Sequence, residues 1–419
     1  MDKLKITGGS RLSGRVEIAG AKNAALPALA ACLLTDQPVE LSKLPKVRDV
    51  RTMLRVLEQL AASVTETDSG SSIITADRYA SHEAPYDLVK TMRASVLVLG
   101  PLLARYGRAR VSLPGGCAIG ERPINFHIEG LQRMGADVTL EHGYVEARVE
   151  GKLHGARLSF PTKSVTATEN LMMAACLAEG TTTLINCAEE PEIVDLAELL
   201  NAMGASVHGA GTDEILVEGR PFLHGAKHRV ISDRIEAGTY LIAGAMAGDR
   251  LELFDCDPFH MRPVLEQLSG AGVDIEVSER TITVTAPDRI EARDLRTSPH
   301  PGYPTDMQAQ YMAMMTQAHG TSVIAETVFE RRFMHVGELL RMGADIRIDG
   351  HTAVVVGPTR LTGAQVMATD LRASASLVLA GLVADGVTVI DRVYHLDRGY
   401  EPIEHKLGAL GASIERIRS

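Results

Sequence analysis

The sequence predicts an α/β protein of two domains, each built from three repeats of about 70 residues. The chain has 419 residues, more than one hydrophobic core usually holds, so two domains are expected. One phrase recurs six times: an apolar helical segment leads through a small residue into a segment rich in β-branched residues. The small residue lies at Ala61, Gly135, Gly204, Gly272, Gly343 and Gly411, at intervals of 74, 69, 68, 71 and 68 residues.

Within each repeat the pattern predicts a helix, a strand, a loop, a second helix and one or two further strands. The first helix ends at a turn residue, and the strand follows directly in TTTLINC, DRLELFDC, TSVIAET and GVTVIDR, which are rich in β-branched residues. The glycine after the second helix fits a left-handed helix C-cap. Six repeats of this length match neither a solenoid nor an eightfold barrel. The turn residues are Asp36, Gly107, Gly180, Gly248, Gly320 and Gly386.

The composition limits the classes of function. Hydrophobic residues make up 45% and charged residues 23%, as in globular proteins, and the net charge is -10. Aromatic residues are only 4% and Trp is absent, so a base-stacking surface is not expected. We therefore expect no nucleic-acid partner.

The cysteines and the apolar segments predict a cytoplasmic protein. The N-terminus has no apolar segment of the signal-peptide kind, and the longest apolar runs fall short of the roughly 18 residues of a membrane span. No membrane association is therefore expected. Five scattered cysteines without a C-x-x-C motif indicate free thiols in a reducing compartment.

Ionisable residues occur where the first helices begin. Counting back fourteen residues from each turn gives Lys22, Arg93, Thr166, Arg234, Asp306 and Arg372. The helix dipole disfavours a cation at this end, so capping does not explain Lys22, Arg93 or Arg372. Arg332 and Arg398 each precede a second helix, and arginine suits carboxylate or phosphate groups. Together these positions predict an anion site.

Two residues are candidates for chemistry. Cys117 lies in the Gly- and Pro-rich segment LPGGCAIGERP, where Arg122 would favour the thiolate, whereas the other four cysteines lie in apolar segments typical of a core. Asp306, in PGYPTDMQAQY, is either a helix N-cap or a general base, and the sequence leaves both open. No phosphate-binding loop, dinucleotide motif or metal-ligand cluster is present, so no cofactor and no metal are expected.

Eight segments in order resemble the UDP-N-acetylglucosamine 1-carboxyvinyltransferases, a family of enolpyruvyl transferases in bacterial peptidoglycan synthesis. They are GGSRLSGRVEIAGAKNAALP, TMRASVLVLGPL, LPGGCAIGERP, EEPEIVD, PTDMQAQ, FERRFMHV, TDLRASASLVLAG and DRGYEPIE. The resemblance implies a two-domain inside-out α/β barrel, with helices inside and sheets outside. It also implies that residues 22–231 form one domain, that residues 1–21 and 232–419 form the other, and that the active site lies in the cleft between them.

The resemblance further implies the reaction: the enolpyruvyl group of phosphoenolpyruvate is transferred to the 3-hydroxyl of UDP-N-acetylglucosamine, and phosphate leaves. It implies that Lys22, Arg122 and Arg398 bind phosphoenolpyruvate, that Asp306 takes the hydroxyl proton, and that Cys117 forms a covalent phosphoenolpyruvate adduct (2-(S-cysteinyl)pyruvic acid O-phosphothioketal) and reacts with fosfomycin. It places the remaining substrate contacts at Asn23, Arg93, Pro123, Ile124, Asn125, Ser164, Val165, Val328, Arg332, Asp370 and Arg372. Roles in cell-wall biogenesis, cell shape and cell division follow from the same resemblance.

Two departures and two alternatives accompany this interpretation. Lys163 stands where an apolar residue is often expected, with Thr162 where some members carry Lys. The family commonly has Asp where this chain has Asn125, near the uridine, which removes a negative charge from that contact. The first alternative is 3-phosphoshikimate 1-carboxyvinyltransferase, with the same fold and chemistry but another acceptor. Cys117 and the AGAKNAALP segment speak against it. The second is a silent paralogue that only binds nucleotide sugars, and the presence of Lys22, Cys117 and Asp306 speaks against that.

Overall fold

The structure is a computed structural model, and it describes residues 2–60, 62–78, 81–90, 92–113, 124–329 and 331–418. The described residues divide into two compact units. The N-terminal unit comprises those between 20 and 231, and the C-terminal unit comprises 2–19 together with those between 232 and 418. Each unit has its own hydrophobic core.

The N-terminal unit contains the following elements, in which η marks a 3₁₀ helix. Its helices are α1 (Lys22–Ala31), η1 (Cys32–Leu34), α2 (Arg48–Gln59), α3 (Tyr86–Val89), η2 (Arg93–Val98), α4 (Leu99–Tyr106), α5 (Asn125–Arg133), α6 (Val165–Ala175) and α7 (Pro191–Ala202). Its strands are β3 (Val39–Ser42), β4 (Ser63–Glu66), β5 (Ser72–Thr75), β6 (Glu83–Ala84), β7 (Arg108–Ser112), β8 (Asp137–Glu141), β9 (Tyr144–Arg148), β10 (Arg157–Ser159), β11 (Thr181–Ile185), β12 (Ser206–His208), β13 (Glu214–Glu218) and β14 (Lys227–Arg229).

The C-terminal unit contains a corresponding set of helices and strands. Its helices are α8 (Arg234–Ala247), η3 (Pro258–Met261), α9 (Arg262–Gly270), η4 (Thr305–Met307), α10 (Gln308–Met315), α11 (Val336–Arg341), α12 (Leu371–Val383), η5 (Val393–Arg398) and α13 (Ile403–Ala409). Its strands are β1 (Lys3–Thr7), β2 (Leu12–Glu17), β15 (Gly248–Phe254), β16 (Asp274–Val277), β17 (Thr281–Thr285), β18 (Leu295–Arg296), β19 (Gly320–Ala325), β20 (Asp345–Asp349), β21 (Thr352–Gly357), β22 (Gln365–Met367), β23 (Val387–Asp391) and β24 (Ser413–Ile417).

The described strands form six four-stranded sheets with one common topology. In the sheet β10-β11-β13-β12, for example, β10 runs parallel to β11, and the other neighbours are antiparallel. Two sheets take strands from the start of the chain: β1 pairs with β23 and β24, and β2 pairs in parallel with β15. The six-repeat prediction is therefore confirmed, as are the four strands expected from TTTLINC, DRLELFDC, TSVIAET and GVTVIDR.

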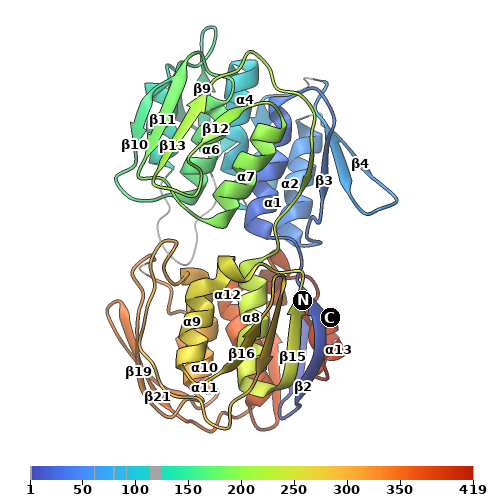
Figure 1. Cartoon of the computed structure of the whole chain (residues 1–419), viewed down its shortest axis with the longest axis vertical. Helices are drawn as coiled ribbons and strands as arrows, with labels where there is room; N and C mark the ends of the chain where they lie inside the picture. Colours follow the sequence, from blue (N-terminus) through green and yellow to red (C-terminus); the bar gives the residue numbers. More distant parts are fainter. Residues whose placement is uncertain are drawn as a thin grey trace. The chain divides into compact units, whose positions relative to one another are not determined.

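The first helix of each repeat lies inside its unit. All residues of α6 from 167 to 175 are buried, and so are those of α12 from 372 to 382. A helix that is apolar on all sides needs cover on all sides. In the C-terminal unit α8, α10 and α12 pack on one another, and the sheets lie outside these helices (Figure 1). The inside-out α/β arrangement is confirmed.

The second helices, apart from the largely buried α7, are amphipathic, and those whose following glycine is described end as predicted. In α2 the residues Val50, Met53, Val56 and Leu57 are buried, whereas the opposite face is exposed. The five glycines that follow second helices within the described residues have φ between 89° and 104°, the left-handed region. None of the described helices is long and apolar enough to span a bilayer.

Candidate active site

Lys22 begins α1 in the N-terminal unit and lies against a buried carboxylate. Its Nζ is 3.8 Å from Oδ2 of Asp49, in the first turn of α2. The Lys22 side chain is 12% exposed and that of Asp49 only 5%. A partly buried ion pair of this kind holds an ammonium group in a fixed place at the start of the helix.

Asp306 joins two arginines in the C-terminal unit. Its Oδ1 accepts a hydrogen bond from Nη2 of Arg332 at 2.6 Å, and its Oδ2 accepts bonds from Nε and Nη2 of Arg372 at 3.1 and 2.9 Å. The two arginine side chains are 5% and 3% exposed, whereas the Asp306 side chain is 25% exposed. The carboxylate is thus the part of this cluster that solvent or a ligand can reach.

The helix-cap interpretation of Asp306 is wrong. The N-cap of η4 is Pro304, no side-chain cap bond forms there, and both carboxylate oxygens of Asp306 accept from arginine. Asp370, in contrast, is a true N-cap, because its Oδ1 accepts from the N–H groups of Arg372 and Ala373 at 2.8 and 3.1 Å.

A second layer of hydrogen bonds, which the sequence did not reveal, orients Arg332. Its Nη1 donates to Oγ1 of Thr305 at 2.8 Å, and Thr305 donates to Oε2 of Glu326 at 2.9 Å. Glu326 is 2% exposed, and its Oε1 also accepts from Thr297 and from the N–H group of Val328, both at 2.9 Å. Thr305 directly precedes Asp306 in the sequence, and this adjacency could have suggested that it contributes to the site. Nothing in the sequence points to Glu326.

The charges in this cluster depend on one another. Burial lowers the pKa of Arg372, but the interactions with Asp306, Tyr400 and Asp233 together outweigh burial, so the net pKa is raised. The guanidinium Cζ lies 5.5 Å from the ring centre of Tyr400, a cation–π contact. Burial lowers the pKa of His335 to about 4, so this neighbour of the cluster is neutral at pH 7.

Other predicted site residues lie at the starts and ends of helices. Ser164 is the N-cap of α6, where its Oγ accepts from the N–H group of Ala167, and Val165 is the first residue of that helix. Asn125 begins α5 and lies 3.4 Å from Glu129 through its Nδ2. Asn23 follows Lys22 in α1, Ile124 precedes α5, Val328 follows β19, and Arg398 ends η5.

Part of the predicted site lies outside the described residues. Cys117, Arg122 and Pro123 belong to this part, and so does the side chain of Arg93, whose backbone begins η2. The four other cysteines are buried, as predicted for core residues. Among the described residues the structure therefore brings together Asp306, Arg332 and Arg372 in one unit and fixes Lys22 in the other.

Comparison with known families and proteins identifies one chemistry. The family model that matches residues 6–407 is described as EPSP synthase (3-phosphoshikimate 1-carboxyvinyltransferase). A protein of Solibacter usitatus is 57% identical over 418 residues, and one of Xylella fastidiosa is 56% identical over 424 residues. The matches cover 100% of this chain and of both relatives, and both are named UDP-N-acetylglucosamine 1-carboxyvinyltransferase.

Solved structures agree on the fold. The enolpyruvyl transferase NikO from Streptomyces tendae has a TM-score of 0.90 at 26% identity, covering 100% of this chain and 99% of that one. EPSP synthase from Acinetobacter baumannii has a TM-score of 0.77 at 18% identity, with 100% of each chain covered. The second likeness supports the fold alone.

Proposed function

Since the chain belongs to the enolpyruvyl transferase family that the EPSP synthase model describes, we propose that it transfers the enolpyruvyl group of phosphoenolpyruvate to the 3-hydroxyl of UDP-N-acetylglucosamine and releases phosphate. The observation that carries the choice of acceptor is the full-length identity with two relatives that bear the name of this activity. The residues of the site support the chemistry, as follows.

Cations bind phosphoenolpyruvate in this proposal. The substrate carries a carboxylate and a phosphate, and fixed cations bind such groups through charge-assisted hydrogen bonds. Lys22, Arg122 and Arg398 take this role. The pairing of Lys22 with the buried Asp49 supports it, because the ammonium group is held in place before any substrate arrives.

Asp306 is the proposed base that takes the proton of the 3-hydroxyl. Both oxygens of this carboxylate accept hydrogen bonds from guanidinium groups. They also fix the direction of the carboxylate, and the partial exposure of Asp306 leaves it accessible to the acceptor. Arg332 and Arg372 thus position the base, and Thr305 with Glu326 positions Arg332.

The reaction proceeds by addition and elimination. Protonation of the methylene carbon of phosphoenolpyruvate leaves an electron-poor C2, to which the sugar oxygen adds while Asp306 takes its proton. The C2–O bond to phosphate then breaks, a proton leaves the methyl group, and the enol ether forms. Cys117 adds to the same C2 in the proposed covalent adduct. No cofactor takes part.

The nucleotide sugar is bound by the remaining predicted residues. Ser164 and Val165 support this role because the start of α6 presents backbone N–H groups, which favour phosphate oxygens. Asn125 offers an amide in place of the family's carboxylate for the uridine. The other proposed contacts are Asn23, Arg93, Pro123, Ile124, Val328 and Asp370.

The second candidate acceptor is shikimate 3-phosphate, the acceptor in the description of the family model. The similarity to a solved EPSP synthase is at 18% identity, far below that to the two full-length relatives. The acceptor named by those relatives is therefore the better supported one.

Product analysis tests the proposal. The purified chain is incubated with phosphoenolpyruvate and UDP-N-acetylglucosamine, and the product is characterised by mass spectrometry and NMR. We expect one enolpyruvyl group on the 3-oxygen of the sugar and one phosphate released per product. A 3-deoxy analogue of the acceptor should bind without reaction. An enolpyruvyl group at any other position would overturn the assignment.

The cellular role follows from this activity. We propose that the protein acts in the cytoplasm at the first committed step of peptidoglycan synthesis, and hence in cell-wall biogenesis, cell shape and cell division. The free, buried thiols of the described cysteines support a reducing compartment. Fosfomycin is the expected inhibitor through Cys117.

A further inference from the structure

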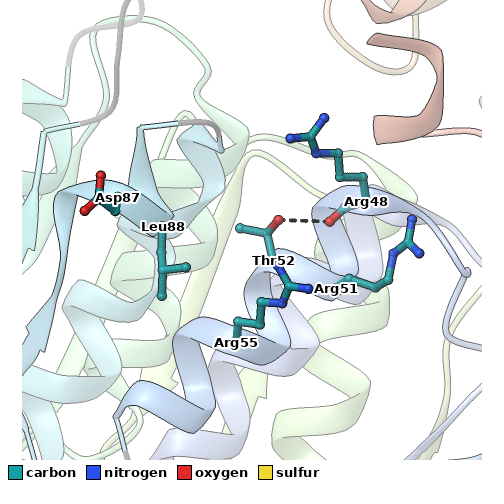
Figure 2. A pocket seen from close by; sticks show the side chains of 6 residues that line it. All are labelled: Arg48, Arg51, Thr52, Arg55, Asp87 and Leu88. Atoms are coloured by element: carbon teal, nitrogen blue, oxygen red, sulfur yellow. Dashed lines mark hydrogen bonds between the residues drawn. The ribbon is translucent and has the colours of Figure 1, made fainter. Parts of the chain in front are cut away.

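Helix α2 presents three arginines on its exposed side. Arg48, Arg51 and Arg55 are spaced three and four residues apart, which places them on one face of a helix. All three are exposed. Figure 2 shows the three arginines on α2 and Asp87 and Leu88 on the neighbouring α3, with the Arg51 side chain extending to the side of α2 away from α3; all five residues line one pocket.

The buried face of α2 fixes this arrangement. Asp49, Val50, Met53 and Leu57 are each at most 4% exposed, and α2 packs against α1, α3 and β4. Burial of these side chains prevents the helix from rotating about its axis. The three guanidinium groups therefore remain on the solvent side.

A cavity of about 350 Å³ lies beside these arginines, lined also by Thr52, Asp87 and Leu88. This volume is within the range of small-molecule sites, roughly 300–1,000 Å³. The Oγ1 of Thr52 donates to the carbonyl oxygen of Arg48 at 3.0 Å, so this hydroxyl is bonded within the helix.

The positive charge of the pocket is not neutralised from within. Among the residues that the structure describes, Arg48, Arg51 and Arg55 form no ion pair, and the pocket's carboxylate, Asp87, pairs with Lys90 at 2.7 Å. In a chain of net charge -10, three such cations at one cavity produce a local positive potential that attracts anions.

We propose that this pocket binds an anion made of two or three linked phosphate groups, as a site separate from the one that carries out enolpyruvyl transfer. Each guanidinium can bind phosphate oxygens through two parallel N–H groups. Arg55 follows Arg48 by seven residues, which corresponds to a distance of about 10 Å along the helix axis. A row of cations of this length matches a chain of phosphates better than a single phosphate or carboxylate.

Calorimetric titration with tripolyphosphate and with ATP tests the proposal. UDP-N-acetylglucosamine is present at saturation and phosphoenolpyruvate is omitted, so that the acceptor site is filled and no turnover occurs. The double variant Arg51→Gln/Arg55→Gln should weaken tripolyphosphate binding at least about tenfold, because two charge-assisted contacts are lost. The variant Arg133→Gln removes an exposed helical arginine of the same unit, in α5, and should change the Kd less than about twofold.

Two further comparisons identify the class of ligand and test whether the shape of the guanidinium groups matters. Equal affinity for ATP and tripolyphosphate assigns the site to the phosphate chain, and tighter ATP binding assigns it to nucleotides. Arg51→Lys/Arg55→Lys keeps both charges but loses the two-pronged contact, so its affinity should lie between those of the wild type and the Gln double variant.

Three results would overturn the proposal. Absence of tripolyphosphate and ATP binding to the wild type is the first, and unchanged binding to the Gln double variant is the second. The third is a rise in the KM for UDP-N-acetylglucosamine in that variant, parallel to the loss of tripolyphosphate binding, because the arginines would then belong to the substrate site. Circular dichroism confirms that each variant is folded.

Discussion

At the scale of single residues, Asp306 is joined to arginines that lie 26 and 66 positions away in the chain. One carboxylate holds two side chains that are almost completely buried, and Thr305 and Glu326 hold one of those in turn. The negative charge of Asp306 therefore contributes to the stability of the cluster as well as to the proposed proton transfer. A substitution of Asp306 should change both the stability of the protein and the reaction rate.

Replacing Asp306 with Asn keeps the shape of the side chain and removes the base. A positioned base contributes about 10²–10⁴-fold, so kcat should fall by that factor. The Kd for UDP-N-acetylglucosamine, measured by calorimetry, should change much less, because an amide still contacts the hydroxyl. The melting temperature should fall, since the buried Arg372 loses its counter-charge.

The matched control is Asp257→Asn, which changes an exposed carboxylate at the N-cap of η3 in the same unit. It should leave kcat unchanged. An unchanged kcat in Asp306→Asn itself would mean that another group takes the proton.

Fosfomycin should label one cysteine, Cys117. Burial raises the pKa of Cys32 well above its usual value and that of Cys176 and Cys187 to about 12, and Cys256 is buried as well. A thiol that is both inaccessible and protonated does not open an epoxide. Peptide mass spectrometry should find a single adduct, and Cys117→Asp should abolish it. Adducts on any of the four buried cysteines, or none at all, count against the proposal.

The buried carboxyl group of Glu169 should make the stability of the protein depend on pH. It is 1% exposed in α6, and burial, with smaller contributions from Glu192 and Glu190, raises its pKa well above the ordinary value. At pH values below the pKa that Glu169 has in the unfolded chain, the neutral carboxyl therefore makes its full contribution to the stability of the fold. That stability is lost as the pH rises toward the folded pKa, because the unfolded state then releases the proton more readily.

The side chain of the Glu169→Gln variant cannot ionise. The melting temperature of the variant minus that of the wild type should therefore increase as the pH rises from about 5 to about 8. Glu198→Gln, an exposed position of α7, provides the control and should show the same difference from the wild type at both pH values. A Glu169→Gln difference that does not depend on pH would show that Glu169 is ionised throughout.

At the scale of elements, the turn from a second helix into the next strand is the most regular feature of the chain. The sequence predicted it from local spacing alone, and the helix starts at Lys22, Arg93 and Arg234 agree with the structure to the residue. Such features are local, so a single sequence contains them. The turn after α13 allows the prediction to be tested with two neighbouring glycines.

Gly411 follows α13 with φ of +104°, and an added Cβ would lie 3.0 Å from the carbonyl oxygen of Arg11. Gly411→Ala should therefore lower the free energy of unfolding by at least about 1–2 kcal/mol. Gly408 lies within α13 with nothing near an added Cβ, and Gly408→Ala should raise stability by up to about 1 kcal/mol. Urea denaturation measures both. Equal effects of the two substitutions would contradict the left-handed turn.

At the scale of the whole molecule, long-range pairing limits what a sequence reveals. Repeat number and strand positions follow from periodicity, but β14 pairs with β3, almost 190 residues earlier, and no local signal selects that partner. The same limit applies to the site. Charged helix starts identified Lys22 and Arg372 as candidates. Only the structure shows that Arg332 bonds Asp306 directly and that Thr305 links Glu326 to Arg332, because these contacts depend on tertiary packing.

Phosphate release on mixing the purified chain with phosphoenolpyruvate and one acceptor tests the proposed activity most directly. With UDP-N-acetylglucosamine we expect release that requires both substrates and falls by about 10²–10⁴-fold in Asp306→Asn. With shikimate 3-phosphate we expect no release above the background without acceptor. Release with shikimate 3-phosphate and none with UDP-N-acetylglucosamine would contradict the account.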